Sequence, residues 1–408
     1  MLQILSTSNE TSTGAELVQN GNFSEIGSDL VTNGDFSAEG INLVDNPNFT
    51  DTGSELITNG DFATGDMTGW SVGSSGDGVT PTAVSDGSGG YGALISNGVT
   101  SGNSYITQNS VFEEGKSYKV SYRIVSNSLP LTNFLTLEDY DVAIPSTVGT
   151  HDIFVVGLST ELRAVFKRAS ANTNIVITDI SIKELGADWT LGDGWSIGED
   201  KAVCDGTQTA YSTIKQIGVT PINTNYKMVF TVTITSGNVI PSVGGSNGQG
   251  QISVSGTYTF YTIATTGDNN LYFGASSDFV GSITNISVQE LGEGWSVQTG
   301  WSIGEDKAIC DGSTNNALKQ VLTLPIGNIK VTFKVEDFTS GTLKLWVNLP
   351  TFTNVISVNA NGDYEVYVTT NSGANNLYFY SVAFIGSITN ITVQEVGQDW
   401  TLGTGASI

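Results

Sequence analysis

The stretch LITNGDFATGDMTGW (56–70) decides how this sequence is interpreted. An apolar run, an Asn-Gly turn, one Phe and a Gly-containing segment that ends in Trp are typical of the opening strand and first turn of a small β-domain. Its first half also occurs three times upstream, as LVQNGNFSEIG, LVTNGDFSAEG and LVDNPNFTDTG. The four copies start at Glu16, Asp29, Asn42 and Glu55, a strict period of 13 residues. The sequence therefore repeats one strand-and-turn unit before its first domain begins.

Composition indicates an all-β protein of several domains. The chain has 408 residues, which is too long for one compact core, and 49 of them are Gly. Only 13% of residues are charged, and the net charge is −25. Such a charge repels a phosphate backbone and an anionic membrane surface, so we expect neither nucleic acid nor a membrane as partner. The start, MLQILSTSNETSTG, lacks a basic and an apolar segment, so we expect no secretion signal and no membrane insertion.

Two long internal repeats set the predicted domain boundaries. GADWTLGDGWSIGEDKAVCDGT begins at Gly186, and GEGWSVQTGWSIGEDKAICDGS begins at Gly292. The two units close with GSITNISVQEL and GSITNITVQEV, and a third opening, GQDWTLGTGASI, starts at Gly397. A more distant relative precedes them and ends in VITDISIKEL. The predicted division is an N-terminal arm (1–54), a first β-domain (55–185), two sister domains (186–291 and 292–396) and a truncated opening (397–408).

Alternating runs such as SYKVSYRIV, YKMVFTVTIT, IKVTFKV and DYEVYVTT recur between Gly- and Asn-rich turns. A period of two places one face on a core and the other in solvent, which predicts antiparallel sheets. About 105 to 130 residues of short strands per unit favour a two-sheet sandwich with jelly-roll connections.

The arm needs a surface to bind, because ordering 13 residues costs roughly 1–2 kcal/mol per residue in backbone entropy. Two interpretations stay open. The arm is a floppy leader left by duplication, or it docks by strand addition on a symmetric assembly or on neighbouring copies of the chain. The apolar residues kept in every copy favour docking. The predicted docking residues are Leu17, Val18, Phe23, Leu30, Val31, Phe36, Leu43, Val44 and Phe49.

The segments ELITNGDFATGDMTGW and ITDISIKEL resemble the ends of carbohydrate-binding modules with a galactose-binding-like jelly roll. The sister units, with DWTLGDGWSIGEDKA, look like β-sandwich domains found in tandem in tail-fibre and other virion proteins of tailed bacteriophages. The resemblance implies tandem antiparallel β-sandwiches. It also implies a structural calcium near the opening strand, held by the Asn59 carbonyl, Asp61 and Asp179. Ala63 stands where the family usually has Glu, and the sister units lack an N-G-D-F strand.

A sugar site in such a module is an aromatic platform flanked by amide and carboxylate groups. The candidates are Tyr91, Tyr105 and Tyr122, although an aromatic residue on a strand is more often part of the core. The shared GWS sequence predicts one common core position for Trp70, Trp195 and Trp301. Trp189, Trp295 and Trp400 precede that sequence, and we expect them to pack where one domain meets the previous one.

Catalytic chemistry finds no support in the motifs. His151 is the single histidine, which excludes a His-dependent triad in the sister units, and there is no zinc-type Cys/His spacing. Cys204 and Cys310 occupy matching KAVCDG and KAICDG segments, so each is expected to be a lone buried thiol. The chain is predicted to be non-catalytic, with no cofactor other than a possible calcium ion.

The functional prediction is a phage virion protein, a fibre or a capsid or tail decoration, on the particle exterior. In this hypothesis the arm binds other virion proteins, the sandwiches bind host-surface polysaccharide, and the chain forms a homo-oligomer, with a trimer favoured. Two alternatives remain: a purely architectural capsid-stabilising protein, and a secreted bacterial polysaccharide-binding adhesin. A glycan hydrolase would need a catalytic domain for which the chain has no room.

Overall fold

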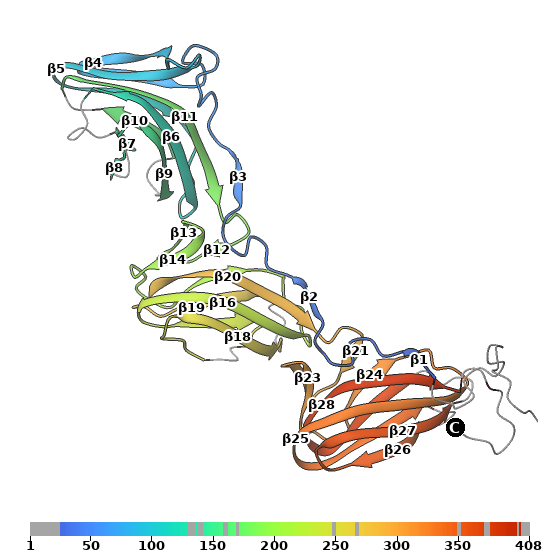
Figure 1. The fold of residues 1–408 in the computed structure, drawn as a ribbon. Helices are drawn as coiled ribbons and strands as arrows, with labels where there is room; N and C mark the ends of the chain where they lie inside the picture. The colour runs from blue at the N-terminus through green and yellow to red at the C-terminus, as the bar shows by residue number, and fades with distance from the viewer. Residues whose placement is uncertain are drawn as a thin grey trace, which may run out of the picture. The chain divides into compact units, whose positions relative to one another are not determined.

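The structure is a computed structural model and describes residues 25–128, 135–137, 142–157, 162–168, 171–246, 250–265, 269–348, 352–370, 376–397 and 400. All regular elements in these ranges are β-strands (Figure 1), which confirms the predicted all-β class. No helix long and apolar enough to cross a membrane occurs in the part of the chain that is described. The described parts of residues 1–40 and 290–408 form one compact unit, and those of 41–289 form another.

We call the nine-stranded sheet formed by β3 to β11 the first sandwich. Its strand order is β8-β7-β10-β5-β11-β6-β9, and β3 adds on β11 and β4 on β5. The strand pairs of this sheet are antiparallel throughout the described residues. Its strands are β3 (Thr52–Glu55), β4 (Ser71–Ser85), β5 (Tyr91–Gln108), β6 (Ser117–Asn127), β7 (Leu135–Leu137), β8 (Val142–Ile144), β9 (Gly149–Val156), β10 (Ala164–Arg168) and β11 (Thr173–Leu185).

The predicted alternation of apolar and polar residues along the strands identifies the residues that form the core of the first sandwich. Along β6, Tyr118, Val120, Tyr122 and Ile124 are buried, while the residues between them are partly exposed. Because successive side chains of a strand point to opposite faces, this single run forms one side of the core.

The middle sandwich (186–291) has two sheets, one of four strands in the order β12-β15-β19-β17 and one in the order β13-β14-β20-β16-β18 with β2 added on β20. Buried aromatic residues fill the space between the sheets, among them Tyr226, Phe230 and Phe273. The strands are β2 (Glu39–Asn42), β12 (Thr190–Leu191), β13 (Trp195–Gly198), β14 (Lys201–Asp205), β15 (Ser212–Gln216), β16 (Asn225–Ser236), β17 (Val239–Val243), β18 (Gly256–Ile263), β19 (Leu271–Ala275) and β20 (Val280–Leu291).

The last sandwich (292–396) repeats this plan with longer strands. β25 and β28 each take the place of two strands of the middle sandwich, and they pair with each other along most of their length. The strands are β1 (Ile26–Asp29), β21 (Trp295–Val297), β22 (Trp301–Gly304), β23 (Lys307–Asp311), β24 (Ala317–Val321), β25 (Gly327–Asn348), β26 (Phe352–Val358), β27 (Gly362–Thr370) and β28 (Asn376–Val396).

The three short strands of the N-terminal arm each add to the closing strand of one sandwich. β3 pairs with β11, β2 with β20 and β1 with β28. In Figure 1 they are the blue strands beside the ends of these longer strands. The residues predicted as a separate arm (1–54) are therefore, where described, edge strands of the sandwiches. The physical reason is that the closing strand of each sandwich offers free backbone groups that an isolated 13-residue segment cannot supply to itself.

Candidate functional site

The best-defined recognition site among the described residues joins one arm repeat to each sandwich. We number the repeats by their first residues: repeat 1 (16–28), repeat 2 (29–41), repeat 3 (42–54) and repeat 4 (55–67). Repeat 4 lies on the first sandwich, repeat 3 on the middle one and repeat 2 on the last one. Equivalent atoms make the contacts in all three cases.

The first residue of each repeat links the arm to the closing strand through its side chain. The Glu55 carboxylate accepts hydrogen bonds from its own chain at Ile57 N–H, 3.0 Å, and from the closing strand at Ile182 N–H, 2.9 Å. Asn42 makes the same pair of bonds with Val44 and Val288. Asp29 makes them with Val31 and Val393. One side-chain oxygen thus satisfies two backbone donors in each sandwich.

A glutamine from the sandwich holds the fourth residue of each repeat. Gln216 accepts from the Asp45 N–H and donates to the Asp45 carbonyl, both at 3.0 Å. Gln320 holds Thr32 at 3.0 and 2.8 Å, and Gln108 holds Thr58 at 3.1 and 2.6 Å. A primary amide carries a donor and an acceptor side by side, so it can pair with both backbone groups of one residue. We call these three residues the glutamine clamp.

In repeats 2 to 4 an Asn-Gly-Asp-Phe or Asn-Pro-Asn-Phe turn places one aromatic ring in a sandwich core. Phe36, Phe49 and Phe62 have φ of +58°, +58° and +53°, which is unusual for a bulky residue. Their rings are buried and lie 5.3, 5.2 and 5.7 Å from the rings of Trp295, Trp189 and Trp70 respectively. The aromatic pair closes one end of each core.

These contacts correct the prediction that the arm docks on an assembly or on other copies. Phe36, Phe49 and Val44 are buried, and Leu43 packs on the middle core. Leu30 and Val31 are half-buried, and Leu30 N–H donates to Val393 O at 2.8 Å. The chain's own sandwiches therefore use all six of these residues. Leu17, Val18 and Phe23 lie outside the described residues.

The tryptophan prediction also needs correction. Trp189 and Trp295 lie beneath the arm phenylalanines and so belong to the docking site, as does Trp70. Trp195 and Trp301 pack elsewhere in the core, against Phe279 and Phe384. The GWS sequence therefore does not mark one common position, because the arm partner in the sister domains is the earlier Trp of each opening.

The three predicted glycan-binding tyrosines have different environments. Tyr122 is fully buried, its hydroxyl donates to Pro145 O at 2.6 Å, and burial raises the pKa of its phenol. Tyr122 is therefore a core residue and cannot form a platform. Tyr105 is half-buried and lies across Gly73 of β4, where a Cβ would be 2.2 Å from the tyrosine ring. Only Tyr91 exposes a large part of its ring, 42% of the residue.

The ring of Tyr91 lies beside a polar loop of repeat 4. At Gly65 a Cβ would lie 3.4 Å from the Tyr91 ring, so the loop backbone runs along the ring. The Asp66 carboxylate next to Gly65 accepts from Thr64 Oγ1 at 2.7 Å and from Thr68 N–H at 2.9 Å. These hydrogen bonds lower the pKa of Asp66, which keeps it ionised. An exposed ring and a fixed carboxylate with hydroxyl groups are thus close together.

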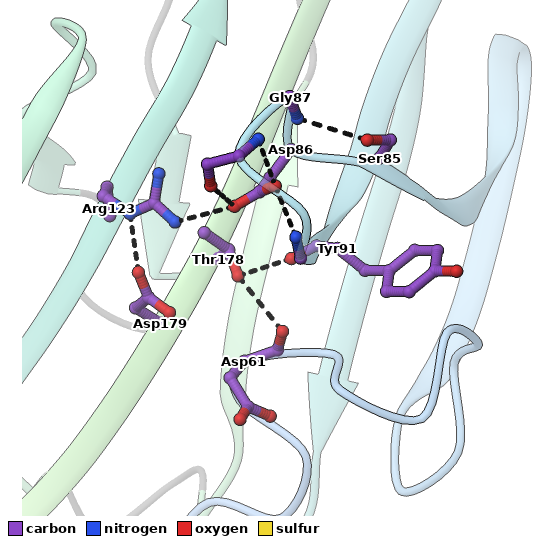
Figure 2. Close-up of polar contacts among 10 residues, drawn as sticks. Asp61, Ser85, Asp86, Gly87, Tyr91, Arg123, Thr178 and Asp179 are labelled. Atoms are coloured by element: carbon purple, nitrogen blue, oxygen red, sulfur yellow. Dashed lines mark hydrogen bonds and ion pairs between the residues drawn. The ribbon is translucent and has the colours of Figure 1, made fainter.

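An ion-pair cluster lies on the other side of Tyr91 (Figure 2), and the ring points away from it. Arg123 contacts Asp179 at 2.6 Å and Asp86 at 3.1 Å. Hydrogen bonds from Ser88, Arg123 and Gly90 lower the pKa of Asp86. Asp86 also closes the loop between β4 and β5 by accepting from Ser88 and Gly90 N–H, both at 2.8 Å. The cluster fixes this loop and with it the start of β5 at Tyr91.

The residues predicted to hold calcium do not form a vacant oxygen cage. The Asn59 carbonyl accepts from the Trp70 indole at 3.0 Å, and Asp179 pairs with Arg123. Asp61 closes its own turn, with Oδ1 accepting from Ala63 N–H at 3.1 Å. No group of three or more His, Cys, Asp or Glu side chains that could hold a metal occurs among the described residues. The oxygens present here do not fit a bound calcium ion.

The remaining reactive side chains have structural surroundings. His151 contacts Thr147 O at 2.7 Å and packs on the Tyr122 ring. Cys204 and Cys310 are free and buried, and burial raises the pKa of both thiols. This agrees with the predicted role of the cysteines as small buried groups.

Comparison with known proteins gives one family match. A family model described as a carbohydrate binding domain matches residues 54–141. That segment contains repeat 4, the loop beside Tyr91 and strands β4 to β6. No curated protein matches the chain.

Three solved structures match the chain at low similarity. One is described as the triple jelly roll fold and turret assembly in an archaeal virus, with 11% identity, a TM-score of 0.18, and coverage of 84% of this chain and 94% of that chain. One is from Sulfolobus turreted icosahedral virus, with 11% identity, a TM-score of 0.16, and coverage of 80% of this chain and 90% of that chain. The third is the secreted serine protease VesC from Vibrio cholerae, with 8% identity, a TM-score of 0.19, and coverage of 73% of this chain and 77% of that chain. TM-scores below 0.2 do not establish a shared fold, so the all-β class follows from the strand pairing of this chain alone. Residues 54–141 are thus similar to a carbohydrate-binding domain, and this is the extent of the family relation.

Proposed function

We propose that the first sandwich is a glycan-binding module and that the chain is a non-enzymatic structural protein that displays it. The observation that carries the proposal is the match of residues 54–141 to a carbohydrate binding domain. Tyr91 supports it, because this exposed ring lies within the matched segment.

The local chemistry suits a sugar ring. A pyranose has an apolar C–H face that can stack on the Tyr91 ring, and its hydroxyls can reach the polar loop at Thr64 and Asp66. The loop lies along the ring because Gly65 has no side chain to hold it away. The Asp86 cluster would keep Tyr91 in place when a glycan binds.

The absence of catalysis is part of the proposal. The single histidine is engaged with Thr147 and Tyr122, and the two thiols are buried. The carboxylates with lowered pKa, such as Asp86 and Asp66, are held by hydrogen bonds and so are suited to accept hydrogen bonds rather than to donate a proton.

A glycan array probed with the full chain tests the binding role. We expect retention on at least one polysaccharide, and we expect Tyr91→Ala to reduce the affinity at least tenfold, about 1.4 kcal/mol. Tyr367→Ala is the matched control, because Tyr367 is 52% exposed but lies in the last sandwich. Retention of no glycan at all would leave a purely architectural role. Equal losses from both variants would contradict a site at Tyr91.

We further propose that the protein lies on the outside of a virus particle, with other virion proteins and host-surface glycan as partners, and as an oligomer. The resemblance of the sister domains to tail-fibre sandwiches supports this location. Repeats 2 to 4 play no part in attachment, because the sandwiches of the same chain occupy them. Gold-labelled antibody on intact particles tests the location, and label found only on free protein would favour the secreted adhesin.

A further inference from the structure

The repeats bind the sandwiches in reverse order. Moving 13 residues upstream in the arm, from repeat 4 to repeat 3 to repeat 2, moves the docking site one sandwich downstream. The next repeat upstream is repeat 1 (16–28), and the next opening downstream starts at Gly397. The reversed order of repeats and sandwiches therefore assigns repeat 1 to the opening at Gly397.

The strand register gives the same pairing. In the first sandwich Thr52 lies opposite Leu185. Phe49, three residues before Thr52, packs on Trp189, four residues after Leu185. At the end of the last sandwich Ile26 lies opposite Val396. Counting three residues back from Ile26 and four residues forward from Val396 in the same way gives Phe23 and Trp400.

The opening turn at Gly397 has the geometry of the two openings that hold an arm repeat. The Trp400 N–H donates to Gly397 O at 3.0 Å, as Trp189 does to Gly186 and Trp295 to Gly292, both at 2.9 Å. The three glycines have φ of +70°, +64° and +83°.

Repeat 1 keeps the residues that dock the other repeats. Glu16 has the carboxylate that Glu55 uses, and Asn20, Gly21 and Phe23 supply the turn and the ring. We propose that repeat 1 docks on the opening segment at Gly397 to Trp400, with Phe23 on the Trp400 indole of the same chain. The same chain is the partner because Ile26 and Val396 are already paired, which leaves only a few residues to each ring.

Fluorine NMR of the full chain labelled with 5-fluorotryptophan tests the contact. The chain has seven Trp, and the Trp400→Phe variant identifies the Trp400 resonance. We expect Phe23→Ala to shift that resonance and to leave the other six in place. Phe23→Leu keeps an apolar side chain but removes the ring, so it should shift the same resonance. Phe36→Ala is the positive control and should shift Trp295. Ile41→Ala changes an exposed arm residue and should shift neither.

Two outcomes would overturn the proposal. The first is a Trp400 resonance that is unchanged in both Phe23 variants. The second is recovery of the original resonance when unlabelled wild-type chains are added to the labelled Phe23→Ala chain, which would show that the contact forms between copies. A shift that does not depend on protein concentration and is not reversed by added chains supports docking within one chain.

Discussion

At the scale of single residues, the glutamine clamp carries a clear energetic prediction. Gln216→Ala removes both hydrogen bonds to Asp45 and leaves two backbone groups of repeat 3 without their partner. Such a loss costs about 1–3 kcal/mol, and the free energy of unfolding measured with urea should fall by this amount. Hydrogen exchange should also become faster in residues 43–49.

Gln251→Ala is the matched control for the clamp, because Gln251 is exposed in the same sandwich. It should change the free energy of unfolding by less than about 0.5 kcal/mol. Equal effects of the two variants would show that Gln216 does not hold the arm.

Acid should destabilise the first sandwich through Asp86. The pKa of its carboxyl lies below the ordinary value of 3.8 in the folded chain because Ser88, Arg123 and Gly90 donate hydrogen bonds to it. Below about pH 4 the unfolded chain takes up a proton that the folded chain does not, so the free energy of unfolding falls as pH falls. Asp86→Asn should reduce this fall in calorimetric or urea unfolding between pH 5 and roughly pH 3. Asp51→Asn, at an exposed position of the arm, should leave this fall in the free energy of unfolding unchanged.

The sequence predicted part of the candidate site at this scale. Strand alternation places Tyr122 on the inner face of β6, between the buried Val120 and Ile124, so its burial was foreseeable. The contact of the Tyr91 ring with the loop at Gly65 was not, because the two lie in different segments of the chain. Composition and spacing carry no information on such a contact.

At the scale of elements, the near-equivalence of the repeats predicts that the arm can slip by one repeat. Deleting residues 42–54 removes repeat 3 but keeps the 13-residue period. Repeat 2 should then dock on the middle sandwich and repeat 1 on the last one, with Phe36 on Trp189 and Phe23 on Trp295. In the fluorotryptophan spectrum of this deletion, Phe23→Ala should shift the Trp295 resonance.

Deleting residues 42–47 is the matched control, because it breaks the period. This variant loses Asn42 and Asp45, which hold the arm on the middle sandwich, and the Asn46 turn that places Phe49, and loss of a buried Phe side chain costs about 3–5 kcal/mol. Its middle sandwich should therefore unfold at a lower temperature than in the 13-residue deletion. Equal unfolding temperatures of the two deletions would contradict the slip.

The period and the turn of the arm were visible in the sequence, but its partner was not. The sister domains lack an N-G-D-F strand of their own. The structure explains this, since repeats 2 and 3 supply the missing strand from the arm. The sequence feature that could have revealed the partner is the equal number of repeats and domain openings. There are four repeats and four openings, at Trp70, Trp189, Trp295 and Trp400. The 13-residue period alone does not identify the surface to which the backbone groups of a repeat form hydrogen bonds.

At the scale of the whole molecule, net charge predicts a salt effect. Forty acidic residues face 15 basic ones, and the resulting repulsion opposes the folded state. Salt at about 0.1 M shortens the range of this repulsion to roughly 10 Å. The temperature of unfolding should therefore rise between low salt and 0.15 M sodium chloride in scanning calorimetry. A falling temperature would mean that surface ion pairs such as Lys330 with Glu365 dominate.

The all-β class followed from composition and alternation alone, because both depend on short-range preferences. The layout of the arm depends on contacts across very long sequence separations, such as the 364 residues between Asp29 and Val393. Local patterns do not encode such distances.

The reversed order of docking has a consequence for biosynthesis. A ribosome makes the repeats first, yet repeat 2 finds its closing strand only when residue 393 has been translated. Repeat 4 can be used early, repeat 3 later and repeat 2 last, so maturation proceeds outward from residue 55 in both directions along the chain. A nascent chain stalled before the last sandwich would expose an unused adhesive segment, which makes premature termination a route to aggregation.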